Sequence, residues 1–402
     1  MSARMSVRML VAALAVTALP QVVLAGPLTP PPGPVGPTNK TLGEVEPRVA
    51  INATNTPGDS DATPSVFKIT QPGSYYLTGN ITGVTGKIGI EVASGGVTID
   101  LNGFVLGGVP GSLAGIASTE SGMSSIAVRN GTIRGWGGAG VSFAAIGLVN
   151  NAQVSSLVVS GNAGGGIRAG YRCAITECTV YSNTGIGISV GSDSTVSNCR
   201  VSGSTGDGIN GTVSVTVTGC VSNENTGSGI AISSGVITGC VANSNTLNGI
   251  NNSAGGVITA CVANHNGGHG FNLSYGTISN STARNNTLNG ISVSSGCTIL
   301  NNTCAANGVL DGVGAGIFAT GNDNRIEGNN CMSADYGIRV TGIGNVIVRN
   351  SVSGNSTANW SISSSNVYGP IVDRTSPGSA SVNGNAAADA SGSTHPNANF
   401  TY

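Results

Sequence analysis

The sequence predicts an all-β protein wound as a single parallel β-helix with about 21 residues in each turn. Two observations carry this prediction, an unusual composition and a repeat that runs through most of the chain. Of the 402 residues, 64 are Gly, 39% are hydrophobic and only 8% are charged. Gly disfavours helices by about 1 kcal/mol per position, and a disordered chain would carry more charge and fewer apolar residues. The Gly residues also lack the strict three-residue period of collagen. The structure that this composition still allows is one of short β-strands joined by frequent turns.

A Gly followed by an apolar residue recurs every 20 or 21 residues, and this repeat predicts how the strands stack. Each period holds three short apolar runs separated by Gly, Asn and Ser, which predicts three strands per turn. One such unit cannot bury its own apolar side chains, whereas stacked units pair like strands in parallel and bury them along a common axis. Counting looser repeats on both sides, we expect roughly 11–13 turns within residues 65–369. The repeated pairs are Gly166-Ile167, Gly187-Ile188, Gly208-Ile209, Gly229-Ile230, Gly249-Ile250, Gly270-Phe271, Gly290-Ile291, Gly316-Ile317 and Gly337-Ile338.

A column of Asn lies four residues before the repeated Gly and is interrupted once, by Ser204. Asn tolerates the left-handed backbone conformation of a tight corner. At a strand spacing of about 4.8 Å its amide can also bond to the turns above and below. We therefore interpret the column as a structural ladder. Its members are Asn162, Asn183, Asn225, Asn245, Asn266, Asn286 and Asn307.

Five of the nine Cys form a second column, nine residues before the repeated Gly. Their side chains are expected to point the same way into the core, where free Cys behaves as a small hydrophobe. A metal site needs ligands that converge from different directions, so we expect no metal and no cofactor here. Disulfides between Cys173 and Cys178 or between Cys297 and Cys304 remain alternatives. The column consists of Cys178, Cys199, Cys220, Cys240 and Cys261.

The two ends of the chain differ from the repeat. Residues 1–25 have a basic start, an apolar run from Met9 to Leu19 and small residues at the end, which is the pattern of a secretory signal peptide. Residues 26–64 are expected to form a Pro/Gly-rich spacer and an N-terminal lead-in, and residues 370–402 an irregular C-terminal tail.

Charge and hydropathy restrict the partners and the compartment. Without residues 1–25 the chain holds 14 basic and 17 acidic residues, a net charge near −3. We exclude a nucleic-acid partner because it would require a basic stripe. No other apolar stretch approaches the roughly 20 residues of a membrane crossing, so no transmembrane segment is expected after signal removal. The expected location is extracellular or at the cell surface, with the periplasm as the alternative.

The repeated Asn-x-x-x-Gly-Ile turns, together with the run Ile99-Asp100-Leu101-Asn102-Gly103, resemble the right-handed parallel β-helix repeat proteins of the pectin-lyase-like superfamily. The resemblance covers roughly residues 65–366. It implies a single-stranded, right-handed helix, and it is specific for the fold and weak for activity. Relatives with known activity are polysaccharide lyases, glycoside hydrolases and sugar epimerases, alongside phage tailspikes and adhesins. Secreted bacterial members similar to the whole chain are not tied to a known reaction.

One local match points to catalysis. The segment Gly268-His269-Gly270 is similar to a Gly-His-Gly motif of polygalacturonase-type hydrolases, and Asp207 lies where those enzymes carry paired acids. The second Asp of that pair is missing here. Asp207 and His269 are also three turns apart, about 14 Å at the spacing of paired strands, whereas glycoside hydrolysis needs two carboxylates about 5–10 Å apart.

Further candidate acids lie where the 21-residue step is broken, between Cys304 and Cys331. They are Asp311, Asp323 and Glu327. Insertions in a solenoid often build the functional site. These acids would support catalysis if they converged, together with Asp335, within about 10 Å beside a groove.

The favoured function is a binding or structural role without catalysis, with a polysaccharide or cell-surface glycan as partner. Polar residues two positions after the repeated Gly would contact it, and the candidates are Arg168, Asn210, Asn251, Asn272 and Arg339. The alternative is a polysaccharide-degrading hydrolase or lyase that uses the acids of the irregular turns.

Overall fold

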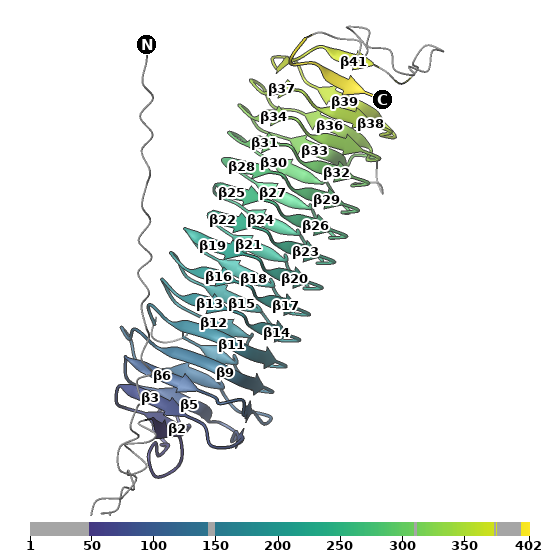
Figure 1. Ribbon diagram of the computed structural model, residues 1–402. Coiled ribbons are helices and arrows are strands. Elements are labelled where there is room, and N and C mark those ends of the chain that lie inside the picture. The colour runs from purple at the N-terminus through teal and green to yellow at the C-terminus, as the bar shows by residue number, and fades with distance from the viewer. Residues whose placement is uncertain (1–47, 144–148, 309–311, 374, 376–394) are drawn as a thin grey trace, which may run out of the picture. The chain divides into compact units, whose positions relative to one another are not determined.

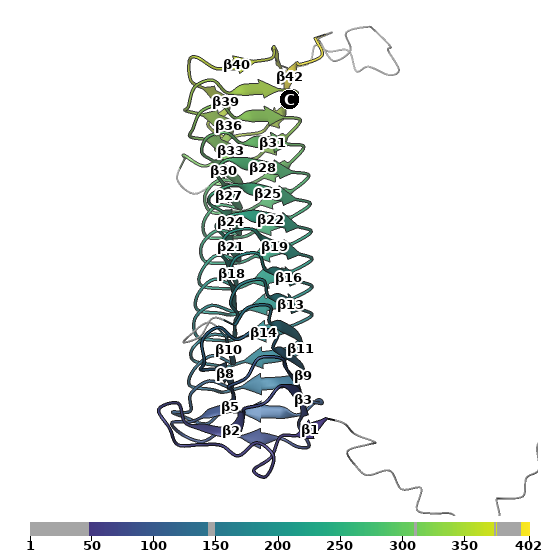
Figure 2. The ribbon, with the colours of Figure 1, turned by 90° about the vertical axis from the view of Figure 1, so that its left-hand side faces the viewer.

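A computed structural model describes residues 48–143, 149–308, 312–373, 375 and 395–402. Within these ranges the chain is all β, and the strands form one stack of parallel coils (Figures 1 and 2). The predicted signal peptide and most of the predicted spacer lie outside the described residues. No helix in the described ranges has the length and hydropathy that a membrane crossing requires.

Three series of strands run along the stack. Sheet I is a parallel sheet of 14 strands, so the described residues complete 14 coils, slightly more than the 11–13 expected. Most of its strands begin at or next to the repeated Gly-apolar pair. They are β2 (Ser65–Ile69), β5 (Ile88–Val92), β8 (Ile116–Ser118), β10 (Val141–Ser142), β12 (Ile167–Arg168), β15 (Ile188–Val190), β18 (Ile209–Gly211), β21 (Ile230–Ile232), β24 (Ile250–Asn252), β27 (Phe271–Leu273), β30 (Ile291–Val293), β33 (Ala315–Ala319), β36 (Tyr336–Val340) and β39 (Ala358–Ile362).

Sheet II follows sheet I along each coil. Its strands are β3 (Gly73–Tyr76), β6 (Val97–Asp100), the first half of β9 (Ala127–Arg134), the first half of β11 (Gln153–Ser160), β13 (Ala174–Thr176), β16 (Thr195–Ser197), β19 (Val215–Thr218), β22 (Gly235–Thr238), β25 (Gly256–Thr259), β28 (Gly276–Ser279), β31 (Thr298–Leu300), β34 (Arg325–Glu327), β37 (Val346–Val348) and β40 (Val367–Tyr368), with β1 (Val49–Ala50) paired to β3.

Sheet III closes each coil before the chain returns to sheet I. Its strands are β4 (Ile81–Thr82), β7 (Val105–Gly107), the second halves of β9 and β11, β14 (Thr179–Tyr181), β17 (Arg200–Ser202), β20 (Val221–Asn223), β23 (Val241–Asn243), β26 (Val262–Asn264), β29 (Thr282–Arg284), β32 (Thr303–Ala305), β35 (Asn330–Met332), β38 (Ser351–Ser353) and β42 (Asn399–Thr401), which also pairs with β41 (Ile371–Asp373). The long strands β9 and β11 run through sheets II and III and join them.

Like residues stack on like residues because each coil repeats the register of the one before. In sheet I, Ile188 pairs with Ile209, which pairs with Ile230. These side chains point inward and have no exposed surface. Burial of an Ile side chain contributes roughly 2–3 kcal/mol, so the stacked columns are the main stabilising element. This arrangement confirms the predicted parallel β-helix.

The corners differ in one respect from the expected mechanism. The left-handed conformation falls on the residue before each ladder Asn, for example on Ser182 (φ 53°) before Asn183 and on Ser244 (φ 56°) before Asn245. The ladder Asn is thereby free to turn its side chain into the coil, where it is buried. The expectation that the ladder Asn itself takes the strained conformation was therefore wrong.

The C-terminal segment, expected to be irregular, ends in an ordered strand. Strand β42 pairs in parallel with β38 of the preceding coil. Asn399 is buried, and its amide donates to the backbone oxygens of Ile347 and Gly369, both at 3.1 Å. This strand covers part of the last coil, where an open sheet edge would otherwise be exposed.

Candidate functional site

The Asn column lies at the corner between sheets III and I. Asn245 is typical: its Nδ2 donates to Oδ1 of Asn266 and to the backbone oxygen of Ser222, both at 3.0 Å. Its Oδ1 accepts from the backbone N–H and Nδ2 of Asn225, also at 3.0 Å. Each amide thus satisfies backbone groups that the corner leaves unpaired, which is a structural role.

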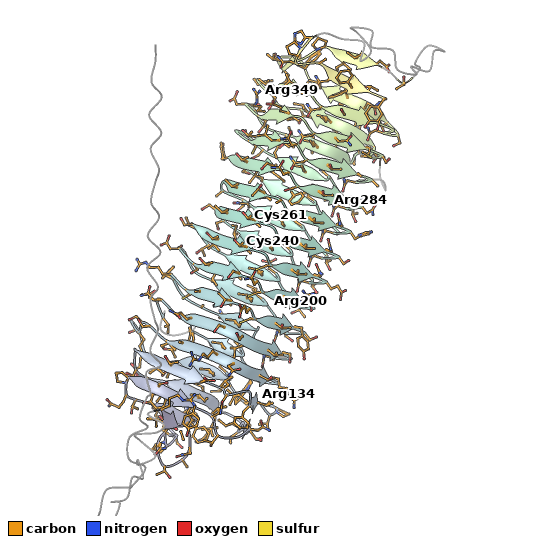
Figure 3. All side chains as sticks on the ribbon, viewed as in Figure 1. Arg134, Arg200, Cys240, Cys261, Arg284 and Arg349 are labelled. Carbon is orange, nitrogen blue, oxygen red and sulfur yellow. The ribbon has the colours of Figure 1, made fainter. Side chains whose placement is uncertain are left out.

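The Cys column lies at the corner between sheets II and III. The thiol of Cys220 donates to the backbone oxygens of Thr218 (3.4 Å) and Val196 (3.6 Å), and Figure 3 shows Cys240 and Cys261 of the same column. All nine Cys lie in the described ranges and are free and buried. The alternative disulfides Cys173–Cys178 and Cys297–Cys304 do not form.

Two further inward columns were missed in the sequence. Toward the C-terminus the Cys column is continued by hydrogen-bonding residues, so that Asn302 Nδ2 donates to Oδ1 of Asn329 at 3.0 Å. The third corner, between sheets I and II, carries another Asn ladder. The first column contains a 27-residue step from Asn302 to Asn329, and the second begins after a 27-residue step from Cys297 to Asn324, so neither ladder continues the regular 21-residue columns of the earlier coils. The members are Ser281, Asn302, Asn329, Asn350 and Asn399 in the first column, and Asn324, Asn345 and Asn366 in the second.

Asp207 and His269 share one column at the start of sheet I, three coils apart. Asp207 Oδ1 accepts the backbone N–H of Ser228 at 2.8 Å, and its Oδ2 accepts from Asn210 Nδ2 at 3.0 Å. His269 Nδ1 accepts the backbone N–H of Asn289 at 3.2 Å, and burial lowers the pKa of its imidazole. Both side chains therefore link successive coils.

The acids of the irregular coil lie at different places, with Glu327 in strand β34 and Asp323 at the corner before it. Asp323 is an exposed corner residue with φ 58°. Glu327 is paired with Arg325 and Arg349. Asp335 is buried and accepts the Gly314 N–H at 3.2 Å and the Ser356 hydroxyl at 3.0 Å. Asp311 lies outside the described residues.

The candidate binding residues form one outward column on sheet I, with Arg168 near its N-terminal side and Arg339 near its C-terminal side. Arg168 is exposed. The guanidinium of Arg339 instead lies over the rings of Phe318 (5.1 Å) and Tyr336 (5.0 Å), and it donates to the Val313 backbone oxygen at 3.2 Å.

The middle of this column is the polar part. Asn272 Nδ2 donates to Asn251 Oδ1 at 2.9 Å. A shallow hollow of about 300 Å³ brings Asn210 and Asn251 together with Asp207 and Thr212. Amide and hydroxyl groups beside such a hollow can bind sugar hydroxyls through hydrogen bonds.

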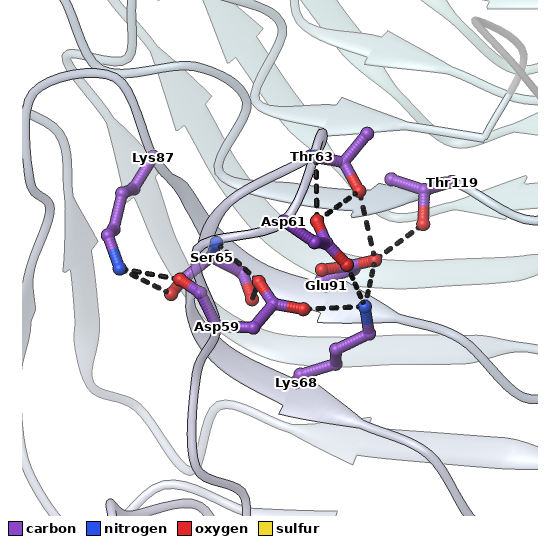
Figure 4. A network of polar contacts seen from close by, with 8 residues as sticks. All are labelled: Asp59, Asp61, Thr63, Ser65, Lys68, Lys87, Glu91 and Thr119. Atoms are coloured by element: carbon purple, nitrogen blue, oxygen red, sulfur yellow. Dashed lines mark hydrogen bonds and ion pairs between the residues drawn. The ribbon is translucent and has the colours of Figure 1, made fainter.

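A charged cluster at the N-terminal end was also missed (Figure 4). Lys68 Nζ lies within 2.6 Å of Asp59 Oδ2, 2.9 Å of Asp61 Oδ2 and 3.1 Å of Glu91 Oε1. Lys68 and Glu91 are paired neighbours in β2 and β5. The coils differ in length here, so no periodic column in the sequence predicts the contact between Lys68 and Glu91.

Comparison with known proteins agrees with this geometry. The family profile described as "Right handed beta helix region" matches residues 114–260. The A-module of the mannuronan C-5 epimerase AlgE6 of Azotobacter vinelandii is similar in structure at 16% identity and a TM-score of 0.51, covering 74% of this chain and 91% of the module. The chain therefore has the right-handed parallel β-helix fold.

Other solved β-helix proteins align less closely. The Dettilon tailspike protein has 14% identity and a TM-score of 0.41 over 79% of this chain and 70% of its own. The catalytic unit of an α-1,3-glucanase from Streptomyces thermodiastaticus has 12% identity and a TM-score of 0.43 over 77% and 66%. No curated protein matches the sequence. At these identities the likeness concerns the fold alone.

Proposed function

We propose that this β-helix binds a neutral or weakly charged glycan along the outward polar column of sheet I and does not cleave it. The observation that carries the proposal is the hollow that joins Asn210, Asn251 and Asp207. Asn272 extends the same surface by one coil through its bond to Asn251. Asn251 and Asn272 are one coil apart and Asn210 lies two coils before Asn251, so the column offers several donors and acceptors to a chain of sugar units.

The candidate acids already form hydrogen bonds or ion pairs within the protein, which supports binding without turnover. Asp207 already accepts two hydrogen bonds, and Glu327 is held by two Arg side chains. Paired-carboxylate catalysis requires two acids that face one glycosidic bond. Asp207, Asp323, Glu327 and Asp335 lie at separate places on the coils. We also place the protein outside the cytoplasm, at the cell surface or secreted, from the pattern of residues 1–25.

The test measures binding and cleavage on the same panel of neutral polysaccharides. The variant Asn210→Ala/Asn251→Ala/Asn272→Ala should lose at least tenfold in affinity for the glycan that binds, because each lost hydrogen bond contributes about 0.5–1.5 kcal/mol. Asn264→Ala is the matched control, since Asn264 lies on sheet III and its Oδ1 has no partner in the described structure.

Reducing-end release by the wild-type protein would contradict the non-catalytic part of the proposal if it disappeared in Asp207→Asn. That variant keeps an oxygen that can accept the Ser228 N–H, so its fold should be preserved. Unchanged binding by the triple variant would contradict the assigned surface.

A further inference from the structure

A second hollow, of about 540 Å³, lies on sheet III near the N-terminal end of the stack. It spans the coils of β4, β7, β9 and β11, on a different face from the polar column of sheet I. Its polar lining consists of Thr82, Arg134 and Ser160. Its volume is within the range of about 300–1,000 Å³ that small-ligand sites occupy.

The floor of the hollow is formed by backbone because Gly occupies adjacent positions in successive coils. At Gly108 a Cβ would come within 2.4 Å of the Gly135 oxygen, so the packing of the coil requires Gly there. Gly107 differs: a Cβ would meet nothing closer than 3.8 Å, and its φ is not in the left-handed region. Gly weakens a strand, so the fold alone would favour a side chain at residue 107. Its absence keeps the hollow open.

The polar groups around the hollow are unused within the described structure. Arg134 is exposed and makes no ion pair or side-chain hydrogen bond to any described residue, and the hydroxyls of Thr82 and Ser160 likewise have no described partner. The Ser160 residue is 7% exposed, and its hydroxyl is not one of the fully buried atoms that lack a partner, so it is accessible from the hollow. A ligand in the hollow could therefore bond to it.

The column that contains the hollow carries one positive charge. The strand pairing places Thr82, Gly107, Arg134, Ser160, Tyr181 and Ser202 in one outward column. Arg134 is the charged member of these six. Figure 3 shows Arg134, Arg200 and Arg284 along the same edge of the stack. A guanidinium presents a fork of N–H donors that matches the oxygens of a carboxylate or sulfate.

An aromatic side chain lies in the coil that follows the lining residue Ser160. Tyr181 is paired with Ser160 in the next coil and is 42% exposed. Ser160 thus lies between Arg134 and Tyr181, which are two coils or about 10 Å apart along the stack. An exposed aromatic ring offers an apolar face with a hydroxyl at its tip, which suits the mixed surface of a sugar ring.

We propose that this hollow binds an anionic sugar unit, with its carboxylate or sulfate on Arg134, its hydroxyls on Thr82 and Ser160, and its ring beside Tyr181. The site is independent of the polar column on sheet I and goes beyond the function proposed for that column. It would give the β-helix a second binding face with a different charge preference.

The test uses the full chain and three ligands that share one ring, namely glucuronate, glucose 6-sulfate and glucose, with inorganic sulfate as the fourth probe. Ligand-observed NMR should show binding of one or both anionic sugars, with glucose and inorganic sulfate at least tenfold weaker. The two anionic sugars distinguish a carboxylate ligand from a sulfate ligand. Equal binding of glucose, or equal binding of inorganic sulfate, would overturn the proposal.

Two variants locate the site. Arg134→Gln should lower the affinity for the anionic sugar about 10–100-fold, as expected for a lost charge-assisted hydrogen bond. Gly107→Thr should abolish binding by filling the hollow while leaving the melting temperature unchanged or higher, because Thr favours strands. Arg284→Gln is the matched control from the same outward column and should bind normally. Wild-type affinity in folded Gly107→Thr would overturn the assignment, and this outcome is separate from any result on the sheet I variants.

Discussion

Lys68 and Glu91 form an ion pair between the first two strands of sheet I, with Nζ and Oε1 3.1 Å apart. The Glu91 side chain has no exposed surface, and its Oε2 has no hydrogen-bond partner in the described structure (Figure 4). Thr119 donates to Oε1 at 2.6 Å. A buried carboxylate depends on its cation, because an unpaired charge in the interior is strongly unfavourable. The pair therefore ties the first coil to the second.

Replacement of the cation should destabilise this end of the stack. We expect Lys68→Met to cost about 3–5 kcal/mol, because it leaves Glu91 buried without a counter-charge. The double variant Lys68→Met/Glu91→Gln should cost less, since it removes both charges. Urea unfolding followed by circular dichroism measures both. A double variant less stable than Lys68→Met would show that Glu91 is not the residue that needs the lysine.

The same cluster predicts a loss of stability in acid. The hydrogen bond from Lys68, followed by that from the Thr63 backbone, lowers the pKa of Asp61 from 3.8 to about 2. A lowered pKa in the folded state stabilises the protein above pH 3.8, and this contribution disappears as the pH falls toward 2. Hydrogen exchange in β2 and β5, corrected for intrinsic rates, should therefore accelerate between pH 4 and 2. Asp61→Asn should show a weaker pH dependence over that interval, and an identical profile would contradict the assignment.

The contribution of Lys68 to stability depends on pH in the opposite direction. Hydrogen bonding to Asp59, followed by Asp61 and Glu91, raises the pKa of Lys68 above 10.5, against the effect of burial. Its contribution is complete below pH 10.5 and is lost only as the pH rises through the raised value. The N-terminal coils should thus stay protected at pH 10, which the same exchange experiment measures.

The Asn ladder predicts that its hydrogen bonds need the amide. Asn245→Ala should cost about 2–3 kcal/mol, because it removes the partner of buried groups on Asn225, Asn266 and Ser222. Asn245→Ser should cost about as much, because the hydroxyl of Ser204 in the same column is buried without a hydrogen-bond partner in the described structure. Equilibrium unfolding in urea measures both. A much smaller loss for Asn245→Ser would mean that a hydroxyl can replace the amide at this corner.

The thiols should be inert in the folded protein. All nine Cys are buried and therefore out of reach of a reagent in solution, and burial also raises the pKa of Cys173 and Cys297. A thiol reagent such as 5,5′-dithiobis(2-nitrobenzoate) should label none of the nine Cys in the folded state and all nine in denaturant. Cys220→Ser should cost only about 1 kcal/mol, because a hydroxyl can donate to the same backbone oxygens. Rapid labelling of the folded protein would contradict the buried column.

The regular part of the fold was predictable because each coil repeats the chemistry of the last. The pairs Gly208-Ile209 and Gly229-Ile230 lie one turn apart, which predicts two paired strands. Asn245 and Asn266 also lie one turn apart, which predicts a ladder. Prediction failed where the period changes. The step from Asn302 to Asn329 is 27 residues, so the second Asn ladder escaped a search for 21-residue columns. The left-handed corner residues also escaped it, because Ser, Glu, His and Ala all occupy that position.

The candidate sites were less predictable than the fold. Asn210, Asn251 and Asn272 could be placed in one outward column from spacing alone. Their hollow with Asp207, and the bonds that engage Asp207 itself, depend on how side chains of neighbouring coils meet.

The sequence alone determined the coil period, the parallel stacking and the inward columns that keep the 20–21-residue spacing, because burial of apolar residues at a constant spacing leaves one arrangement. Only the tertiary structure decided which residues of unequal coils become neighbours. Lys68 meets Glu91 across 23 residues, and Arg134 meets Ser160 across 26. Such contacts follow from the length of each individual coil, and a residue inserted at any corner would shift them while the apolar pattern stayed the same.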